Sequence, residues 1–198
     1  KLTKTIVKRG VTELITPGVA TNDKILDHKS NNFLSSVFFD KNNIIGISFI
    51  DISTGEFLIA QGDEFYIDKL LQSFATSEII FAKQHQKKFK EIFGNKHYTF
   101  ALEDWIYQED YLTEKLLNHF DVKTLKGFGV DNCPTGILAA GACLQYLSDA
   151  EQKNLQHVHQ ISRIEQDEFV WLDRFTARNL ELIHSTHPEG TSLLDIID

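Results

Sequence analysis

The chain has no methionine, two cysteines and three prolines among its 198 residues. The two cysteines, Cys133 and Cys143, lie too far apart for a C-x-x-C motif and are too few to complete a zinc set. We therefore expect reduced thiols in a cytoplasmic protein. Because translation begins with methionine, we expect the chain to be a piece of a longer protein, unless processing has removed the initiator.

Long hydrophobic runs and an excess of positive charge are also missing. No segment approaches the ~20 apolar residues of a membrane span, and no basic-then-apolar leader is present. The 20 basic residues against 28 acidic ones give a net charge of −8, which opposes the electrostatic attraction to phosphate. The composition, 42% hydrophobic and 24% charged, predicts a globular protein that does not grip DNA or a membrane.

The stretch Ile44 to Ala60 gives the strongest local signal. β-Branched and aromatic residues fill two arms, and Ser53-Thr54-Gly55 between them suits a tight turn. In the first arm, apolar side chains alternate onto both pleat faces, which predicts a central strand that ends at Asp51.

The other elements are predicted from apolar spacing and turn residues. Strands are expected at Lys1 to Ile15, Phe33 to Phe39, Glu78 to Ala82 and His97 to Leu102, and helices at Asp63 to Phe74, Lys83 to Phe93, Gln108 to Phe120 and from Asn132-Cys133-Pro134 through Leu147. Three antiparallel strands followed by a strand–helix–strand crossover predict an α/β fold. Small residues in the last of these helices, Ala140 and Gly141, predict close packing against another element.

The polar run from Ser148 to Gln156 is the expected domain boundary, which gives an α/β domain at residues 1–148 and a second part at residues 149–198. In the second part we expect extended chain at His157 to Ile164, a helix that begins after Leu172-Asp173, a loop at His187 to Gly190 and a helix that starts in Ser192 to Asp198.

Carboxylates near strand ends raise the possibility of a two-metal nuclease site. The candidates are Asp40, Asp51 and Glu56. However, such a site needs an acid in the middle of the first strand, and Phe33 to Phe39 contains none. We therefore favour turn roles for Asp40 and Asp51, and we expect Asp51→Asn to be tolerated because an amide oxygen accepts the same turn bonds.

Histidine and lysine clusters are weaker candidates. The pairs His157-x-His159 and His184-x-x-His187 have spacings used by metal sites but lack obvious carboxylate or thiolate partners, so solvated histidines are expected. A basic run, Lys83, Lys87, Lys88, Lys90 and Lys96 with Phe89 and Phe93 between, is expected to be the wet face of an amphipathic helix rather than a phosphate site. Gly127-x-Gly129 lacks a third glycine, and no phosphate loop or nucleophile elbow occurs.

A set of motifs resembles the MutS-type DNA mismatch repair family. Leu172-Asp173 followed by Thr176 to Leu182 is similar to its L-D-x-x-T-x-R-N-L-E-L signature, Ile15 to Gly18 to its I-T-P-G segment, and Asp51 to Phe57 to its D-x-S-T-G-x-F hairpin. Two further matches follow the family order: Gly127 to Val130 with Ala139 to Ala142, and Thr191 to Asp198.

The resemblance implies an RNase-H-like connector domain followed by the start of a helical core or lever domain. It implies no catalytic, cofactor or metal residues in this chain, because the mismatch-reading Phe-x-Glu and the ATPase site with its ATP and Mg would lie elsewhere. Phe89-Lys90-Glu91 fits the bare Phe-x-Glu pattern but is expected to be a coincidence. The implied partners are a MutL-type protein, mismatched DNA through other domains and a second copy of the full-length protein, and the alternative is an RNase-H-like nuclease or resolvase.

Overall fold

The computed structural model describes residues 32–74, 76–150, 155–164, 179–182, 185 and 190–197. Contacts divide the chain into two compact units, Lys1–Ile164 and Glu165–Asp198. Residues 155–164 thus pack with the first unit, while the predicted domain division after residue 148 stays a prediction. Within the part of the chain that the structure describes, every helix is too short or too polar to cross a membrane.

A six-stranded mixed sheet forms the centre of the first unit. Its strands are β1 (Phe33–Phe39), β2 (Ile45–Asp51), β3 (Phe57–Gly62), β4 (Thr76–Ala82), β5 (Thr99–Leu102) and β6 (Ser162–Arg163). The spatial order is β5-β4-β1-β2-β3-β6, in which β1, β2 and β3 are antiparallel while β4 lies parallel to β1 and β5 parallel to β4. This is the predicted RNase-H-like α/β arrangement, and the predicted hairpin and crossover are confirmed.

The central position of β2 follows from its sequence. All seven of its residues are buried, because neighbouring strands and helices cover both edges and both faces. Ile44, which precedes the strand, is 39% exposed, so the covered region begins one residue later than predicted. Gly55 closes the turn into β3 with a φ of 79°, a conformation that favours glycine.

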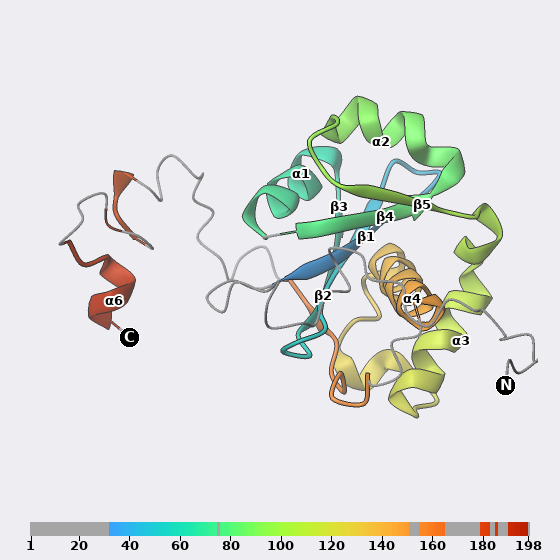
Figure 1. Cartoon of the computed structure of the whole chain (residues 1–198). Helices are drawn as coiled ribbons and strands as arrows, with labels where there is room; N and C mark the ends of the chain where they lie inside the picture. The colour runs from blue at the N-terminus through green and yellow to red at the C-terminus, as the bar shows by residue number, and fades with distance from the viewer. Residues whose placement is uncertain are drawn as a thin grey trace, which may run out of the picture. The chain divides into compact units, whose positions relative to one another are not determined.

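Helices α1 (Glu64–Ser73) and α2 (Gln86–Phe93) cover one face of the sheet (Figure 1). Asp63 caps α1, since its carboxylate accepts a hydrogen bond from the Tyr66 N–H at 2.8 Å. A short 3-10 turn, η1 (Lys83–His85), precedes α2. The predicted helix from residue 83 is therefore present, with its first turn wound more tightly.

The opposite face of the sheet carries α3 (Glu109–Phe120) and α4 (Pro134–Asp149), which follow the 3-10 turns η2 (Asp104–Tyr107) and η3 (Leu125–Phe128) (Figure 1). Asn132 and Pro134 are residue types that favour a helix cap and a first helical turn, respectively. Pro134 does occupy the first turn of α4, but the N-cap is Cys133, which makes no side-chain hydrogen bond, so the expectation that Asn132 caps this helix is wrong. A Cβ on Gly141 would lie 2.7 Å from Leu112 of α3. The predicted close packing is thus confirmed.

Residues 155–164 return along the sheet, and β6 pairs with β3 in parallel. The predicted strand at Lys1 to Ile15 lies wholly outside the described residues, and the predicted helix after Leu172-Asp173 lies largely outside them. In the second unit, α6 (Leu193–Ile197) confirms the last predicted helix. The N–H groups of Leu193 and Leu194 donate to the carbonyls of Glu181 and Leu182 at 3.0 and 2.9 Å.

Candidate functional site

Asp51 is 1% exposed at the end of β2, and its carboxylate organises the hairpin turn. Oδ1 accepts the Ser53 N–H at 2.8 Å, the Ser53 hydroxyl at 2.6 Å and the Thr54 N–H at 3.4 Å. Oδ2 accepts the Asn32 N–H at 3.1 Å. The carboxylate thus satisfies backbone donors that would otherwise be buried unpaired, and the predicted turn role is confirmed.

Two of the three candidate carboxylates, Asp40 and Asp51, lie at opposite ends of the sheet. Pairing of β1 with β2 sets Phe33 opposite Asp51 and Phe39 opposite Ile45, so Asp40 follows the far end of β1. Six residues of strand separate the two positions by roughly 20 Å, whereas two catalytic metal ions lie about 4 Å apart. Within the described residues, no group of three His, Cys, Asp or Glu side chains could hold a metal ion. The geometry therefore gives no support to the nuclease alternative.

A layer of buried polar side chains lies instead between the middle of the sheet and α4. We call this the polar layer, and its members are Ser36, Ser48, Glu78, Tyr107, Cys143 and Tyr146. The Tyr146 hydroxyl donates to Glu78 at 2.8 Å, and the Ser48 hydroxyl lies 3.2 Å from the Cys143 sulfur. These side chains come from five separate elements, β1, β2, β4, η2 and α4, so they meet only when α4 and η2 pack onto the sheet.

Five members of the polar layer are buried and Tyr107 is half-buried, and the titratable groups reflect this burial. Burial raises the pKa of the Cys143 thiol to about 12, against a smaller opposing effect of the Ser48 hydrogen bond. Burial also raises the pKa of Tyr107 well above its usual range, although its hydrogen bond with Ser36 opposes the shift. Both groups stay protonated at neutral pH, so neither supplies a nucleophile or a base.

Two of the described histidines bond to backbone carbonyls, so His157, which was expected to be solvated, has a structural partner. His157 Nε2 is bonded to the carbonyl of Ile52 in the hairpin turn, and His119 Nε2 is bonded to the carbonyl of Val158 at 2.7 Å. His159 is exposed, while His184 and His187 lie outside the described residues. Two imidazoles therefore fasten residues 155–158 to the sheet unit.

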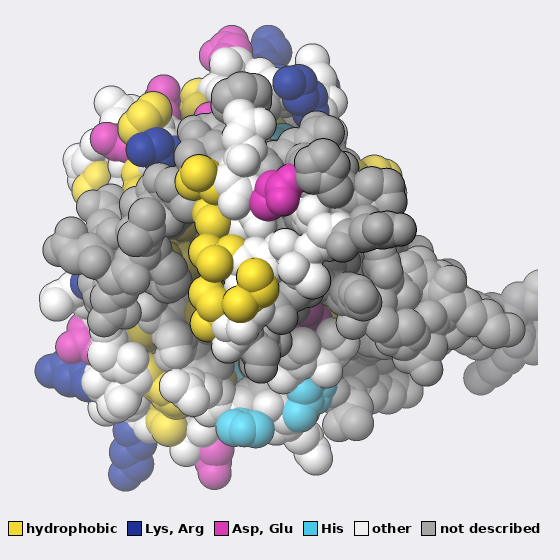
Figure 2. Space-filling view, turned by 90° about the vertical axis from the view of Figure 1, so that its left-hand side faces the viewer, with side chains coloured by type: hydrophobic (Ala, Val, Ile, Leu, Met, Phe, Trp, Pro, Cys, Tyr) yellow, Lys and Arg dark blue, Asp and Glu magenta, His cyan; other side chains and the backbone are white. Residues whose placement is uncertain are grey.

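The basic run on η1 and α2 is the polar side of an amphipathic helix, as predicted. Phe89 and Phe93 are buried, and the Phe89 ring stacks on Phe81 of β4 with centroids 4.5 Å apart. Because the Phe89 ring is buried, it cannot contact a DNA base, so Phe89-Lys90-Glu91 is not a base-reading motif. Among the described side chains in Figure 2, Lys and Arg are scattered between acidic and polar residues rather than gathered into one basic patch.

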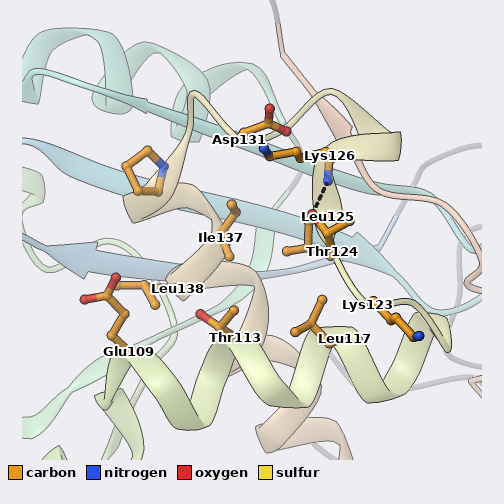
Figure 3. Close-up of a pocket in the computed structure, with 11 residues that line it drawn as sticks. Glu109, Thr113, Leu117, Lys123, Thr124, Leu125, Lys126, Asp131, Ile137 and Leu138 are labelled. Carbon is orange, nitrogen blue, oxygen red and sulfur yellow. Dashed lines mark hydrogen bonds between the residues drawn. The ribbon is translucent and has the colours of Figure 1, made fainter.

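A groove of about 360 Å³ runs between α3, η3 and α4 (Figure 3). Its apolar part includes Leu117, Leu125 and Ile137, and the Lys126 N–H donates to the Thr124 hydroxyl at its edge. Charged side chains of both signs surround it, so the groove carries no net preference for an anion or a cation.

Sequence reasoning missed both the polar layer and the groove. Isolated Ser, Cys and Tyr residues in apolar segments carry no local signal of pairing, because their partners are up to 95 residues away in the chain. The one available signal was Glu78, an acid at the start of an apolar strand.

The sequence is similar to those of known proteins. The sequence profile of the family described as MutS domain II matches residues 32–159. The chain is 58% identical to a DNA mismatch repair protein MutS of Flavobacterium psychrophilum, 57% to that of Flavobacterium johnsoniae and 53% to that of Cytophaga hutchinsonii. Each alignment covers 100% of this chain and 23% of the relative, so the chain spans about a quarter of the length of these curated relatives.

The match covers strands β1 to β5, the hairpin turn and helices α1 to α4. Together with identities above half over the whole chain, it shows that the chain belongs to the MutS domain II family, the connector domain of MutS-type DNA mismatch repair proteins.

Proposed function

We propose that this chain works as the connector part of a DNA mismatch repair protein and couples the binding of mismatched DNA to ATP hydrolysis. The observation that carries the proposal is the 58% identity to a MutS over all 198 residues. Coupling between distant sites needs a body that moves as a unit. A sheet covered on both faces, with two imidazoles fastening the chain that leaves it, suits that role.

The chemistry of the full-length protein is proposed to reside outside this chain. ATP and Mg would bind in an ATPase domain, and mismatched DNA would be held by other domains of a cytoplasmic homodimer. The net charge of −8 supports this division, because it disfavours direct contact with phosphate. A MutL-type protein is the proposed partner of the connector.

A chimeric protein tests the coupling role. The matching segment of the Flavobacterium psychrophilum MutS is replaced by this chain, and mutation frequency is measured in cells that lack their own MutS. We expect the chimera to restore a low mutation frequency, and purified chimera to change its ATPase rate when mismatched DNA is added. A chimera that folds and binds mismatched DNA but shows no such change would contradict the proposal.

A second experiment uses the isolated chain. We expect no ATP hydrolysis and no DNA cleavage with Mg²⁺ or Mn²⁺, and we expect capture of MutL from the same cells. Cleavage that disappears in Asp51→Asn or Asp40→Asn would favour an enzyme instead. A lack of MutL capture would remove that partner from the proposal without affecting the chimera result.

A further inference from the structure

Strand β5 forms one edge of the sheet (Figure 1). The carbonyl of Tyr98 accepts the Ile79 N–H of β4 at 2.9 Å, so the backbone groups of Tyr98 point toward β4. Because successive residues of a strand direct their backbone groups to alternate sides, those of Thr99 and Ala101 point away from the sheet. In the part of the chain that the structure describes, no strand pairs with this outer edge.

Exposed aromatic side chains gather at the same edge. Tyr98 is 57% exposed, Phe100 43% and Trp105, in η2, 58%. Neighbours fix two of them, since Phe100 lies 5.5 Å from Tyr146 and Trp105 lies 6.0 Å from Tyr111 between ring centroids. Rigid, exposed aromatic rings are the side chains that most often anchor protein interfaces.

The stretch that contains β5 and η2 carries an excess of acidic residues. From Tyr98 to Glu114 the chain contains five acidic residues and no Lys, Arg or His. The ion pair of Glu103 with Lys83, at 3.2 Å, brings in a cation from outside this stretch. An approaching strand with basic side chains would be attracted, whereas a second copy of this chain would bring like charges together.

We propose that the outer edge of β5, together with Phe100 and Trp105, binds an extended basic segment of a partner protein as an added strand. The backbone groups of Thr99 and Ala101 bond to the incoming strand, which is the common mode of strand addition at an exposed edge. The aromatic rings cover the aliphatic stems of its Lys or Arg side chains, and the nearby carboxylates face the cationic ends.

The test uses the 198-residue chain and a fluorescent peptide of about ten residues with alternating Lys and Val. We expect saturable binding by anisotropy that weakens as salt is raised, and no binding of a matched Glu–Val peptide. Trp105→Ala and Ala101→Pro should each weaken binding about tenfold or more, because one removes an anchor and the other an outward N–H. Proline is tolerated in an edge strand, and unchanged circular dichroism checks the fold of each variant.

Phe65→Ala is the matched control, since Phe65 is an exposed aromatic on α1, away from β5. Its peptide affinity should equal that of the parent chain. Three results would overturn the proposal: no peptide binding, equal loss in Phe65→Ala and Trp105→Ala, or a dimer in sedimentation that Ala101→Pro dissolves. The last result would assign the edge to a second copy of the chain.

Discussion

The two faces of the sheet are stabilised in different ways. Under α1 and α2 the face is almost entirely apolar, and aromatic rings stack there, with Phe49 and Phe74 centroids 4.4 Å apart. Under α4 the sheet contributes hydroxyl and carboxyl groups, each held by a specific partner. The apolar face gains stability from buried area, which tolerates many side chains of similar volume. The polar face depends on particular pairs, because an unpaired buried group is costly.

Among the substitutions that test this comparison, Gly46→Ala should have the largest effect on stability. Gly46 of β2 faces the start of α4, and a Cβ there would lie 2.1 Å from the Thr135 carbonyl oxygen. Since that neighbour is backbone, α4 must shift, and we expect a loss of at least about 3 kcal/mol in the free energy of unfolding measured with urea. The control Gly127→Ala has no atom within 4 Å of the added Cβ and should change the free energy by less than about 0.5 kcal/mol.

The second test removes one hydrogen bond from the polar layer. Tyr146→Phe deletes the 2.8 Å bond to Glu78, and we expect a cost of about 1–3 kcal/mol in the same measurement. The comparison is Ile79→Leu, because the side chain of Ile79 faces the opposite side of β4 from that of Glu78. This substitution keeps the side-chain volume and should cost less than about 1.5 kcal/mol. If the two substitutions cost the same, the two faces do not differ as we describe.

The third test concerns Asp51, at the end of the sheet. The structure refines the expectation that Asp51→Asn is tolerated, because Oδ2 accepts the Asn32 N–H while Oδ1 accepts the turn bonds. An amide keeps only one acceptor oxygen, so we expect a cost of about 1 kcal/mol in thermal melts. Asp51→Ala should cost more, since it leaves both sets of donors unpaired. Equal melting temperatures for the two variants would contradict the turn assignment.

The smallest effect is expected at His85, which packs beside Phe39 with centroids 5.1 Å apart. Burial lowers the pKa of His85 below 6.5, nearby Lys88 lowers it further, and Asp104 opposes the shift. The unfolded imidazole therefore takes up a proton at higher pH than the folded one, so stability falls as pH drops from 7 toward 5. The titration midpoint by NMR should lie below 6.5, and His85→Asn should reduce the pH dependence of the melting temperature.

Sequence patterns were sufficient for elements whose signal is local. The hairpin at residues 44–60, the helices at residues 64–73, 109–120 and 134–149, and the role of Asp51 follow from spacing, turn residues and short-range bonds. The resemblance to the family could be seen in the sequence because several motifs occur in a fixed order along the chain.

Features that depend on long-range pairing could not be predicted in the same way. Glu78 gave no indication of Tyr146 as its partner, since 68 residues separate them and only the docking of α4 joins them. Likewise, nothing in the sequence near Trp105 distinguishes an exposed aromatic residue from a buried one, whereas the structure leaves Trp105 58% exposed beside β5, an edge strand. These residues depend on strand order and helix docking, which no window of sequence contains.

The attachment of residues 155–164 has a mechanical consequence. Tension on the chain beyond Ile164 first reaches the bond between the Ile164 N–H and the Ile59 carbonyl, at 2.8 Å, and then the parallel pairing of β6 with β3. Further along the chain, the force is transmitted through two hydrogen bonds. The bond of His157 leads to Ile52 in the hairpin turn, and the bond between Val158 and His119 leads to α3. A pull at this point of the chain therefore meets the two-residue pairing of the edge strand β6 first, and the bonds of the two imidazoles then share the force between the sheet and a helix.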